Sequence, residues 1–238
     1  MTGDADQVLQ QVDRPLRTRR SWLTVPLLPT PKRTPFTFFY LALLLGTTLF
    51  LQFGNPALGA RLLELSSTDA HNLWRRPLFA LLTSAFWVSD GTWLPYAVIF
   101  AVAVAPLERR FGALHTMGVF FSGHVLATLA TELPVMWAIR TGDLPRVDGH
   151  WLDIGVSYGF FTTAGALVFL LAGRARLWAL LTMEVFIVLF YVTDDPTTLA
   201  AVVTLLGHTI AAHLGLFFWG PRLRRRSLAR AQPGPDLG

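Results

Sequence analysis

The segment DIGVSYGFFTTAGAL (residues 153–167) decides how the chain is interpreted, because it places a hydroxyl between two glycines at the start of an apolar run. Ser157, between Gly155 and Gly159, is either a buried nucleophile or part of an ordinary small-residue surface between helices. The segment alone is compatible with both interpretations. The class of the chain and the polar residues of its other apolar runs therefore have to be established first.

The composition is that of a membrane protein. Of the 238 residues, 53% are hydrophobic and 15% are charged, whereas a soluble domain carries roughly 25% charged residues. The chain has no cysteine, which excludes disulfides, thiolate metal sites and a cysteine nucleophile. We expect neither a metal nor another cofactor.

Six apolar segments are candidates to cross a bilayer, for which about 20 apolar residues are needed. The second is long, and Ser89-Asp90-Gly91 within it predicts a break or a deep loop. The segments lie near residues 36–53, 77–105, 113–133, 152–172, 177–193 and 198–219. Because lipid tolerates only helices and closed barrels, we predict an all-α polytopic membrane protein with six transmembrane helices.

The basic residues are distributed unevenly about these spans. With a cytoplasmic N-terminus, 15 of the 20 Lys and Arg residues fall on the inner side and five on the outer side, as the positive-inside rule requires. We therefore predict a basic, proline-rich cytoplasmic tail (1–35), a transmembrane domain (36–220) and a second basic cytoplasmic tail (221–238). The final arginine run is expected to contact anionic membrane lipids, and no nucleic acid. Only one of the 20 is a lysine, a bias typical of GC-rich bacteria, so the expected location is a bacterial inner (plasma) membrane.

Several spans carry polar side chains, which are costly in lipid and tend to mark functional positions. His124, Thr128 and Glu132 are spaced by four residues and share one face of the third span. The sixth span carries His208 and His213. An isolated Ser or Thr in a span usually serves to hydrogen bond two helices. The histidines and Glu132 are harder to explain in this way, because an imidazole or a carboxyl group at membrane depth needs a polar partner.

Small residues predict which helices touch. Stripes of small residues lie on the fourth span (Gly155, Gly159, Thr163) and on the sixth (Gly207, Ala211, Gly215). Such stripes let two backbones approach closely, so we expect Gly159 and Ala211 to lie in a contact between these two helices. That contact would bring Ser157 near a histidine of the sixth span, which is the minimum nucleophile–base pair.

The order and spacing of several motifs resemble the rhomboid family, a family of six-helix intramembrane serine proteases. GVSYGFFTTAG (155–165) resembles the family's Gly-x-Ser-Gly motif, in which Ser157 would be the nucleophile. NLWRRPLFALLTSAF (72–86) is similar to the family's Trp-Arg stretch, and LERRFG (107–112) to its Glu-Arg-x-x-Gly turn. The resemblance covers about residues 36–220 and implies a rhomboid-like bundle.

The resemblance also distinguishes the two histidines of the sixth span. In the family a small residue follows the basic histidine by three positions and a glycine by seven, as Ala211 and Gly215 follow His208. His213 meets only the second condition. The resemblance therefore implies that His208 serves Ser157 as general base and then as general acid, with transmembrane segments of other proteins as substrates.

This pairing predicts the arrangement of the neighbouring side chains. We expect a hydrogen bond between Ser157 and His208 of about 2.6–3.2 Å, or looser at rest. Phe161, one turn below the serine, should lie against the imidazole. His213 should be directed elsewhere, toward the third or fifth span or toward lipid.

The chain departs from the family around the oxyanion. Proteolytic rhomboids have a His and an Asn four apart on the second helix, and the corresponding stretch GTWLPYA (91–97) has neither. Tyr158 stands where the family has the glycine after its nucleophile. Loss of one oxyanion donor costs about 10²–10³ in rate. His124, or the backbone N–H groups at the start of the fourth span near Gly155, are candidate substitutes.

Three functions remain open at this point. Retention of Ser157 and His208 favours an intramembrane serine protease. Loss of the His/Asn pair favours a rhomboid-like pseudoprotease, a scaffold that binds transmembrane helices without cutting them. The third class is a small transporter or channel that would use Glu184 and the His124–Glu132 face, but no inverted repeat or pair of broken helices supports it.

Overall fold

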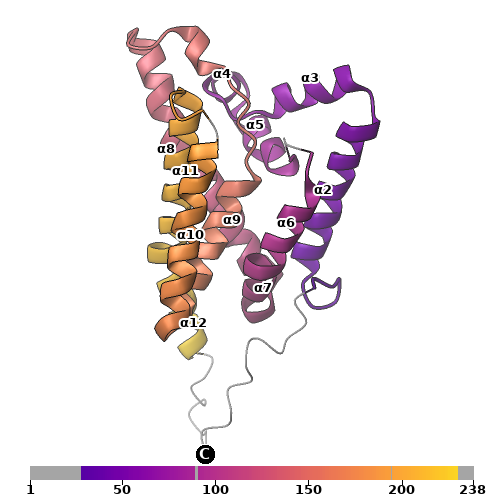
Figure 1. The fold of residues 1–238 in the computed structure, drawn as a ribbon, viewed down its shortest axis with the longest axis vertical. Helices are drawn as coiled ribbons and strands as arrows, with labels where there is room; N and C mark the ends of the chain where they lie inside the picture. The colour runs from indigo at the N-terminus through magenta and orange to yellow at the C-terminus, as the bar shows by residue number, and fades with distance from the viewer. Residues whose placement is uncertain (1–27, 89–90, 194, 230–238) are drawn as a thin grey trace, which may run out of the picture.

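The protein is an elongated helical bundle. The computed structural model describes residues 28–88, 91–193 and 195–229, and this part of the chain contains no β-strand. Most helices run along the bundle, while α3 (Pro56–Ser66) lies across one end and α12 (Gly220–Ala229) is at the other (Figure 1). We call these the α3 end and the α12 end.

Four helices are long and apolar enough to cross a membrane. They are α2 (Pro35–Phe53), α8 (Ala113–Thr141), α10 (Gly173–Thr193) and the continuous helix Leu199–Ala229. Two shorter apolar stretches, Pro77–Phe86 and Val156–Leu170, lie within the other two predicted spans. The predicted all-α membrane fold is confirmed, and the number of six spans stays a prediction.

The remaining helices are short or are parts of longer ones. Between α3 and α8 the chain forms α4 (Ala70–Arg75), α5 (Pro77–Thr83), α6 (Trp93–Ile99) and α7 (Ala105–Phe111). A 3₁₀ turn, η4 (Arg146–Gly149), precedes α9 (Val156–Leu170). The last helix consists of α11 (Leu199–His213), the π-helical segment η5 (Leu214–Trp219) and α12.

The second predicted span is broken, as expected. After α5 and the 3₁₀ turn η2 (Ser84–Phe86), regular helix begins again at Trp93 and passes through a π-helical segment, η3 (Phe100–Val104). Ser89 and Asp90 themselves lie outside the described residues. Because the break separates α5 from α6, the two helices can pack against different neighbours.

A buried carboxylate fixes the position of α2. Glu108 of α7, 1% exposed, accepts hydrogen bonds from the backbone N–H groups of Phe36 (2.7 Å) and Thr37 (2.8 Å) and from the Thr37 hydroxyl (2.6 Å). The first N–H groups of a helix have no partner within it, and an anion there is favoured by the helix dipole. The glutamate of the LERRFG turn therefore joins the first predicted span to the second.

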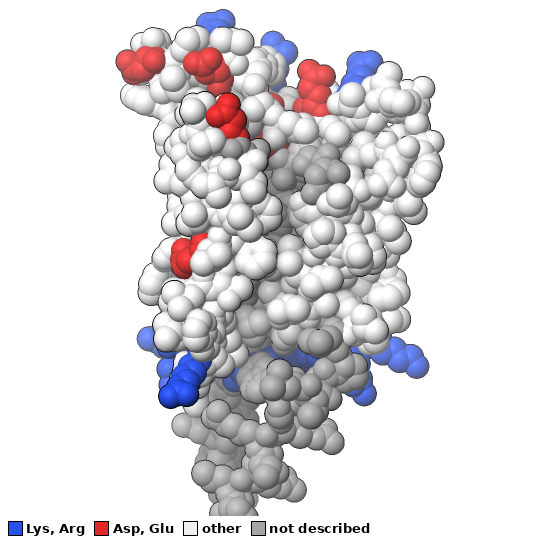
Figure 2. Space-filling model, in the orientation of Figure 1, with Lys and Arg blue, Asp and Glu red and all other residues white. Residues whose placement is uncertain are grey.

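The predicted terminal tails are only partly described. The helix does not end near residue 219 but continues to Ala229, so the start of the tail predicted at 221–238 is helical. Residues 1–27 and 230–238 lie outside the described residues. On the face drawn in Figure 2, the α12 end carries Lys and Arg, whereas Asp and Glu gather with arginines at the α3 end. This distribution follows the sequence pattern, and the direction of insertion stays a prediction.

The two small-residue stripes serve different contacts. A Cβ at Gly215 would overlap the backbone carbonyl of Thr162, and the Thr162 hydroxyl donates to the carbonyl of Ala211 (3.0 Å), so α9 touches α11 and η5 closely. A Cβ at Gly159 would instead overlap the ring of Phe120 on α8. The prediction is therefore confirmed for Ala211 and wrong for Gly159, because α9 is packed between α8 and α11 and its small residues are divided between them.

Candidate functional site

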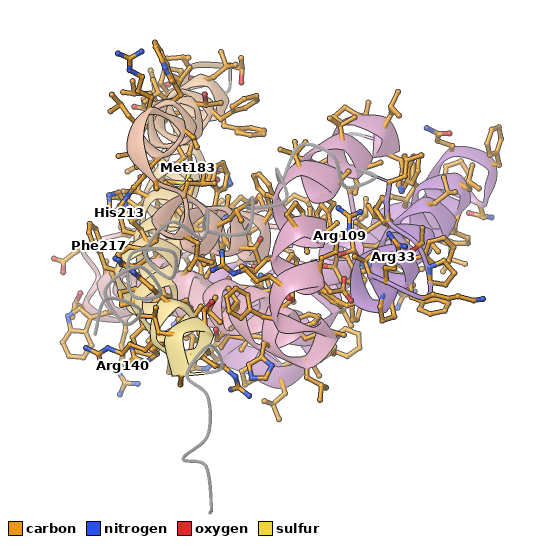
Figure 3. All side chains as sticks on the ribbon, turned by 90° about the horizontal axis from the view of Figure 1, so that it is seen from below. Arg33, Arg109, Arg140, Met183, His213 and Phe217 are labelled. Carbon is orange, nitrogen blue, oxygen red and sulfur yellow. The ribbon has the colours of Figure 1, made fainter. Side chains whose placement is uncertain are left out.

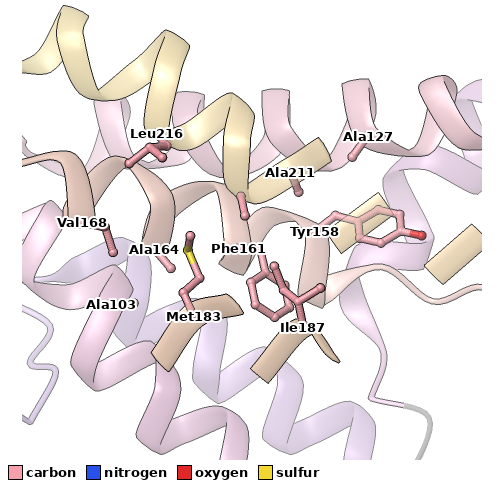
Figure 4. Close-up of a cluster of buried hydrophobic side chains, with 11 residues drawn as sticks. Ala103, Ala127, Tyr158, Phe161, Ala164, Val168, Met183, Ile187, Ala211 and Leu216 are labelled. Atoms are coloured by element: carbon pink, nitrogen blue, oxygen red, sulfur yellow. The ribbon is translucent and has the colours of Figure 1, made fainter. Parts of the chain in front are cut away.

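Ser157 and His208 lie on helices that pack against each other, α9 and α11. Ser157 is half-buried in the first turn of α9, and His208 of α11 is 2% exposed. Figure 4 shows the apolar cluster at this contact, in which Tyr158 and Phe161 project from α9 beside Ala211. The site is thus built into the central packing of the bundle.

Three aromatic rings surround the imidazole of His208. Its centroid lies 4.6 Å from the Phe161 ring and 5.4 Å from the rings of Tyr158 and Phe190. Both imidazole nitrogens are buried without a hydrogen-bond partner among the described residues. The predicted position of Phe161 is confirmed. His208 makes no hydrogen bond to Ser157 in this structure, and the looser resting pair stays a prediction.

The packing of α9 indicates which side of the helix carries Ser157. Ser157 lies one turn before Phe160 and Phe161, and therefore on the same side of the helix. Phe160 is directed toward the second predicted span, where its ring stacks 6.5 Å from that of Phe100. Phe161 fills the space beside His208. The serine therefore lies on the side of α9 that carries Phe160, packed toward η3, and Phe161, packed toward His208.

His213 points away from the site, as predicted. Its Nδ1 lies 2.8 Å from the backbone carbonyl of Thr209, to which it donates a hydrogen bond, and its Nε2 lies 3.9 Å from the carboxylate of Glu184 on α10. Figure 3, seen along the bundle, shows His213 beside Phe217, and their rings stack at 5.7 Å. The predicted direction toward the fifth span is confirmed.

The third-span face holds a group of buried polar atoms. Thr128 and Glu132 of α8 are fully buried, and their side-chain oxygens have no hydrogen-bond partner among the described residues. The buried Tyr158 hydroxyl lies beside Thr131 and within electrostatic range of Glu132. Such a group can bind the polar part of a ligand or water. In the part of the chain that is described, no three His, Asp or Glu side chains are placed to hold a metal ion.

Each of the two candidate oxyanion donors has one N–H or ring nitrogen already engaged, while His124 Nδ1 has no hydrogen-bond partner among the described residues. His124 Nε2 lies 3.1 Å from the hydroxyl of Ser84 and 3.0 Å from the carbonyl of Leu81. The backbone N–H of Gly155 donates to the carbonyl of Ser84 (3.1 Å), and a Cβ at Gly155 would overlap the His124 ring. These residues therefore tie η2 to the start of α9. Ser84 is not among the residues predicted from the sequence, where it is only a small polar residue at the end of an apolar run.

The loop before α9 is held from the α3 end. The backbone N–H and hydroxyl of Thr68 donate to the carbonyl (2.9 Å) and carboxylate (2.8 Å) of Asp153. The hydroxyl of Ser67 donates to the carbonyl of Trp151 (2.9 Å). Burial raises the pKa of Asp153 from 3.8 to about 6, with a further increase from Asp69 and an opposing effect of the Thr68 hydrogen bond. This loop therefore sets where the first turn of α9 and its serine lie.

Comparison with known proteins identifies the family. The family described as "Rhomboid-like protein" matches residues 31–227, which include almost all of the described helices. No curated protein and no solved structure matches the chain. The match extends over most of the sequence and agrees with the helical membrane fold and with the motifs around Ser157. The chain belongs to the rhomboid-like protein family.

Proposed function

We propose that this protein binds transmembrane helices of other membrane proteins, as a rhomboid-like scaffold that does not cut them. The observation that carries the proposal is the pair formed by Glu184 and His213 at the surface of the bundle. The two side chains are 39% and 41% exposed, and both lie near the middle of helices long enough to cross a membrane. Ionisable residues at this depth normally face the interior of a bundle, so an exposed pair is suited to a partner.

The helix that carries Glu184 has an open apolar face. Of the 21 residues of α10, only Met183 and Ile187 are buried. The exposed apolar residues around Glu184 include Val185, Phe186, Val188 and Leu189. An apolar surface with a polar pair in it complements a transmembrane helix that carries a polar side chain at the same depth, because interhelical hydrogen bonds stabilise such contacts in lipid.

The interior favours binding over cleavage. A general base must lie within about 2.6–3.2 Å of the proton donor, or be linked to it through one water, and His208 is enclosed by aromatic rings without a partner. His124 and Gly155 are engaged with η2, and the stretch 91–97 contains neither His nor Asn. Nucleophile activation and oxyanion binding are therefore both weakly supported.

Intramembrane serine proteolysis is the second candidate. It is favoured by the retention of Ser157 and His208 on helices that pack against each other. In that reaction the serine hydroxyl would attack a peptide carbonyl while His208 takes its proton and later protonates the leaving amine. The serine hydroxyl and the imidazole, which are not hydrogen-bonded here, would first have to come within hydrogen-bond distance.

The proposed setting is a bacterial inner membrane, with both ends of the chain in the cytoplasm and with lipids around the bundle. The proposal is supported by the inner excess of basic residues, 15 against five. The basic α12 end would then lie in the cytoplasm, and the α3 end would face the opposite side.

Photo-crosslinking in cells tests the scaffold. A photoreactive amino acid at Val188, on the open face of α10, should give discrete crosslinks to other membrane proteins. These should be lost when Glu184→Leu and His213→Leu are added. A probe at Leu49, an exposed apolar residue of α2, is the matched control. Crosslinks of equal pattern from both positions, or crosslinks insensitive to the two substitutions, would contradict the proposal.

A serine-reactive fluorophosphonate separates the scaffold from the protease. The purified scaffold should show no labelling beyond that of its Ser157→Ala variant. Labelling that disappears in Ser157→Ala and in His208→Ala would establish a competent pair and favour the protease.

A further inference from the structure

We propose that the α3 end carries a binding site for a phosphate group, a site independent of the α10 surface. A pocket of about 550 Å³ lies there between α4, the end of α8 and the turn η4. Its polar lining residues are His71, Arg75, Arg140, Arg146 and His150, with Trp74 beside them. No Asp or Glu is among the lining residues, so the pocket concentrates positive charge.

The three arginines have no ion-pair partner in the part of the chain that the structure describes. Among the described residues, no carboxylate lies within 4.0 Å of Arg75, Arg140 or Arg146. They come from three separate elements, which the tertiary fold brings to one cavity. Gathered like charges repel one another unless an anion lies between them. The absence of an internal counter-ion therefore points to an external one.

The side chains are arranged for recognition and not only for charge. The guanidinium of Arg140 lies 5.8 Å from the Trp74 ring, a cation–π contact that restricts its orientation. The rings of His71 and His150 lie 4.4 Å apart. Burial, followed by Arg75 and His150, lowers the pKa of His71. An imidazole that is neutral can still donate one hydrogen bond to an anion.

Phosphate is the anion that suits this set. Guanidinium groups bind phosphate oxygens through paired, charge-assisted hydrogen bonds, which favours arginine over lysine at such sites. The pocket also has an apolar wall, formed by Met136 and Ile139. Trp74 and Trp137 are 60% and 67% exposed near it, as is typical of aromatic residues at a membrane interface. The group is therefore a phosphate ester, either a phospholipid headgroup or a soluble ester.

Binding to the purified full chain tests the site. The probes are phosphatidylglycerol, titrated into chain held in nanodiscs of neutral phosphatidylcholine, and soluble glycerol 3-phosphate. Arg140→Gln/Arg146→Gln should weaken binding at least about tenfold. Arg61→Gln is the matched control, because Arg61 is an exposed arginine of α3 outside the pocket. Arg146→Gln alone, on the exposed turn η4, provides a second variant with little risk to folding.

Each outcome bears on the proposal. Binding of phosphatidylglycerol alone identifies a lipid headgroup site, and binding of glycerol 3-phosphate as well identifies a site for soluble esters. In both cases the arginine variants must bind more weakly and Arg61→Gln must bind normally. No binding of either probe, or equal weakening by Arg61→Gln, would overturn the site. Neither readout depends on Ser157 or Glu184, so the result is separate from that of the scaffold.

Discussion

The ring of Phe161 on α9 lies 4.6 Å from the imidazole of His208 on α11, centroid to centroid, so the histidine that the sequence singles out as a base is packed against an aromatic side chain of the neighbouring helix. Phe161 is 1% exposed, so the contact is also part of the core. Phe161→Ala should lower the free energy of unfolding by about 3–5 kcal/mol. Thermal unfolding in detergent measures the loss. Phe39→Ala, at a residue 61% exposed on α2, should have little effect, and equal loss in both variants would contradict the packing described.

Replacement of Gly215 tests the closest approach between helices. A side chain there meets the backbone of Thr162, which cannot move aside as a flexible side chain does. Gly215→Leu should therefore cost about 3 kcal/mol or more by overpacking. Gly46→Leu is the matched control, because a Cβ at Gly46 has no neighbour within 4 Å. Wild-type thermal stability of Gly215→Leu would mean that α9 and η5 do not pack in this way.

Removing the charge of Glu108 should loosen α2. Glu108→Gln keeps the shape but leaves one acceptor oxygen in place of two, so at least one of the three hydrogen bonds is lost and the others are no longer made to a charged acceptor. The expected cost is about 1–3 kcal/mol. Glu64→Gln, at an exposed glutamate of α3, controls for the change of charge. Hydrogen exchange of the Phe36 and Thr37 amides should become faster only in Glu108→Gln.

Asp153 should make stability depend on pH. Its pKa is raised from 3.8 to about 6, so the folded protein binds more protons than the unfolded chain between about pH 4 and pH 6. Stability from this group is therefore lost as the pH rises through that window, by up to about 3 kcal/mol. Asp153→Asn should be more stable than the wild type at pH 7.5 and show no advantage at pH 4.

Thermal unfolding at both pH values measures the difference. Asp148→Asn, an exposed residue of the same loop, is the control and should not change the pH profile. If the stability of Asp153→Asn depended on pH as that of the wild type does, another group would be responsible for the pH dependence.

Reporter fusions test the orientation. Because the basic residues divide 15 to five in favour of the inner side, a fluorescent protein fused after Gly238 should be fluorescent in the cytoplasm. Alkaline phosphatase fused after Asn55, before α3, should be active on the opposite side of the membrane. The reverse pattern would overturn the orientation.

The sequence predicted the parts of the fold that depend on local composition. Apolar segments of sufficient length predicted the long helices, and the Ser-Asp-Gly string predicted the break before Trp93. A small residue such as Ala211 could be assigned to a helix contact because close approach requires it. Gly159 was assigned to the wrong neighbour, because α9 is packed on several sides and spacing alone does not say which helix each face meets.

The candidate site was less predictable, since it depends on how helices are rotated. The positions of Ser157 and His208 on contacting helices followed from their motifs. The rings of Tyr158, Phe161 and Phe190 around the imidazole could not be predicted together, because their packing depends on tertiary contacts. In the sequence, the arginines of the proposed phosphate pocket indicate only how basic residues are distributed on the two sides of the membrane. Nothing in the sequence indicates that α4, α8 and η4 meet.

The contact between Glu108 and the start of α2 also constrains biosynthesis. The partners Phe36 and Glu108 are 72 residues apart, and translation adds about 5–20 residues per second. The start of the first helix is therefore synthesised about 4–14 s before its capping carboxylate. During that interval, water must accept the hydrogen bonds of the first backbone N–H groups of α2. The start of α2 can therefore form its hydrogen bonds to Glu108 only after the ribosome has synthesised the LERRFG turn.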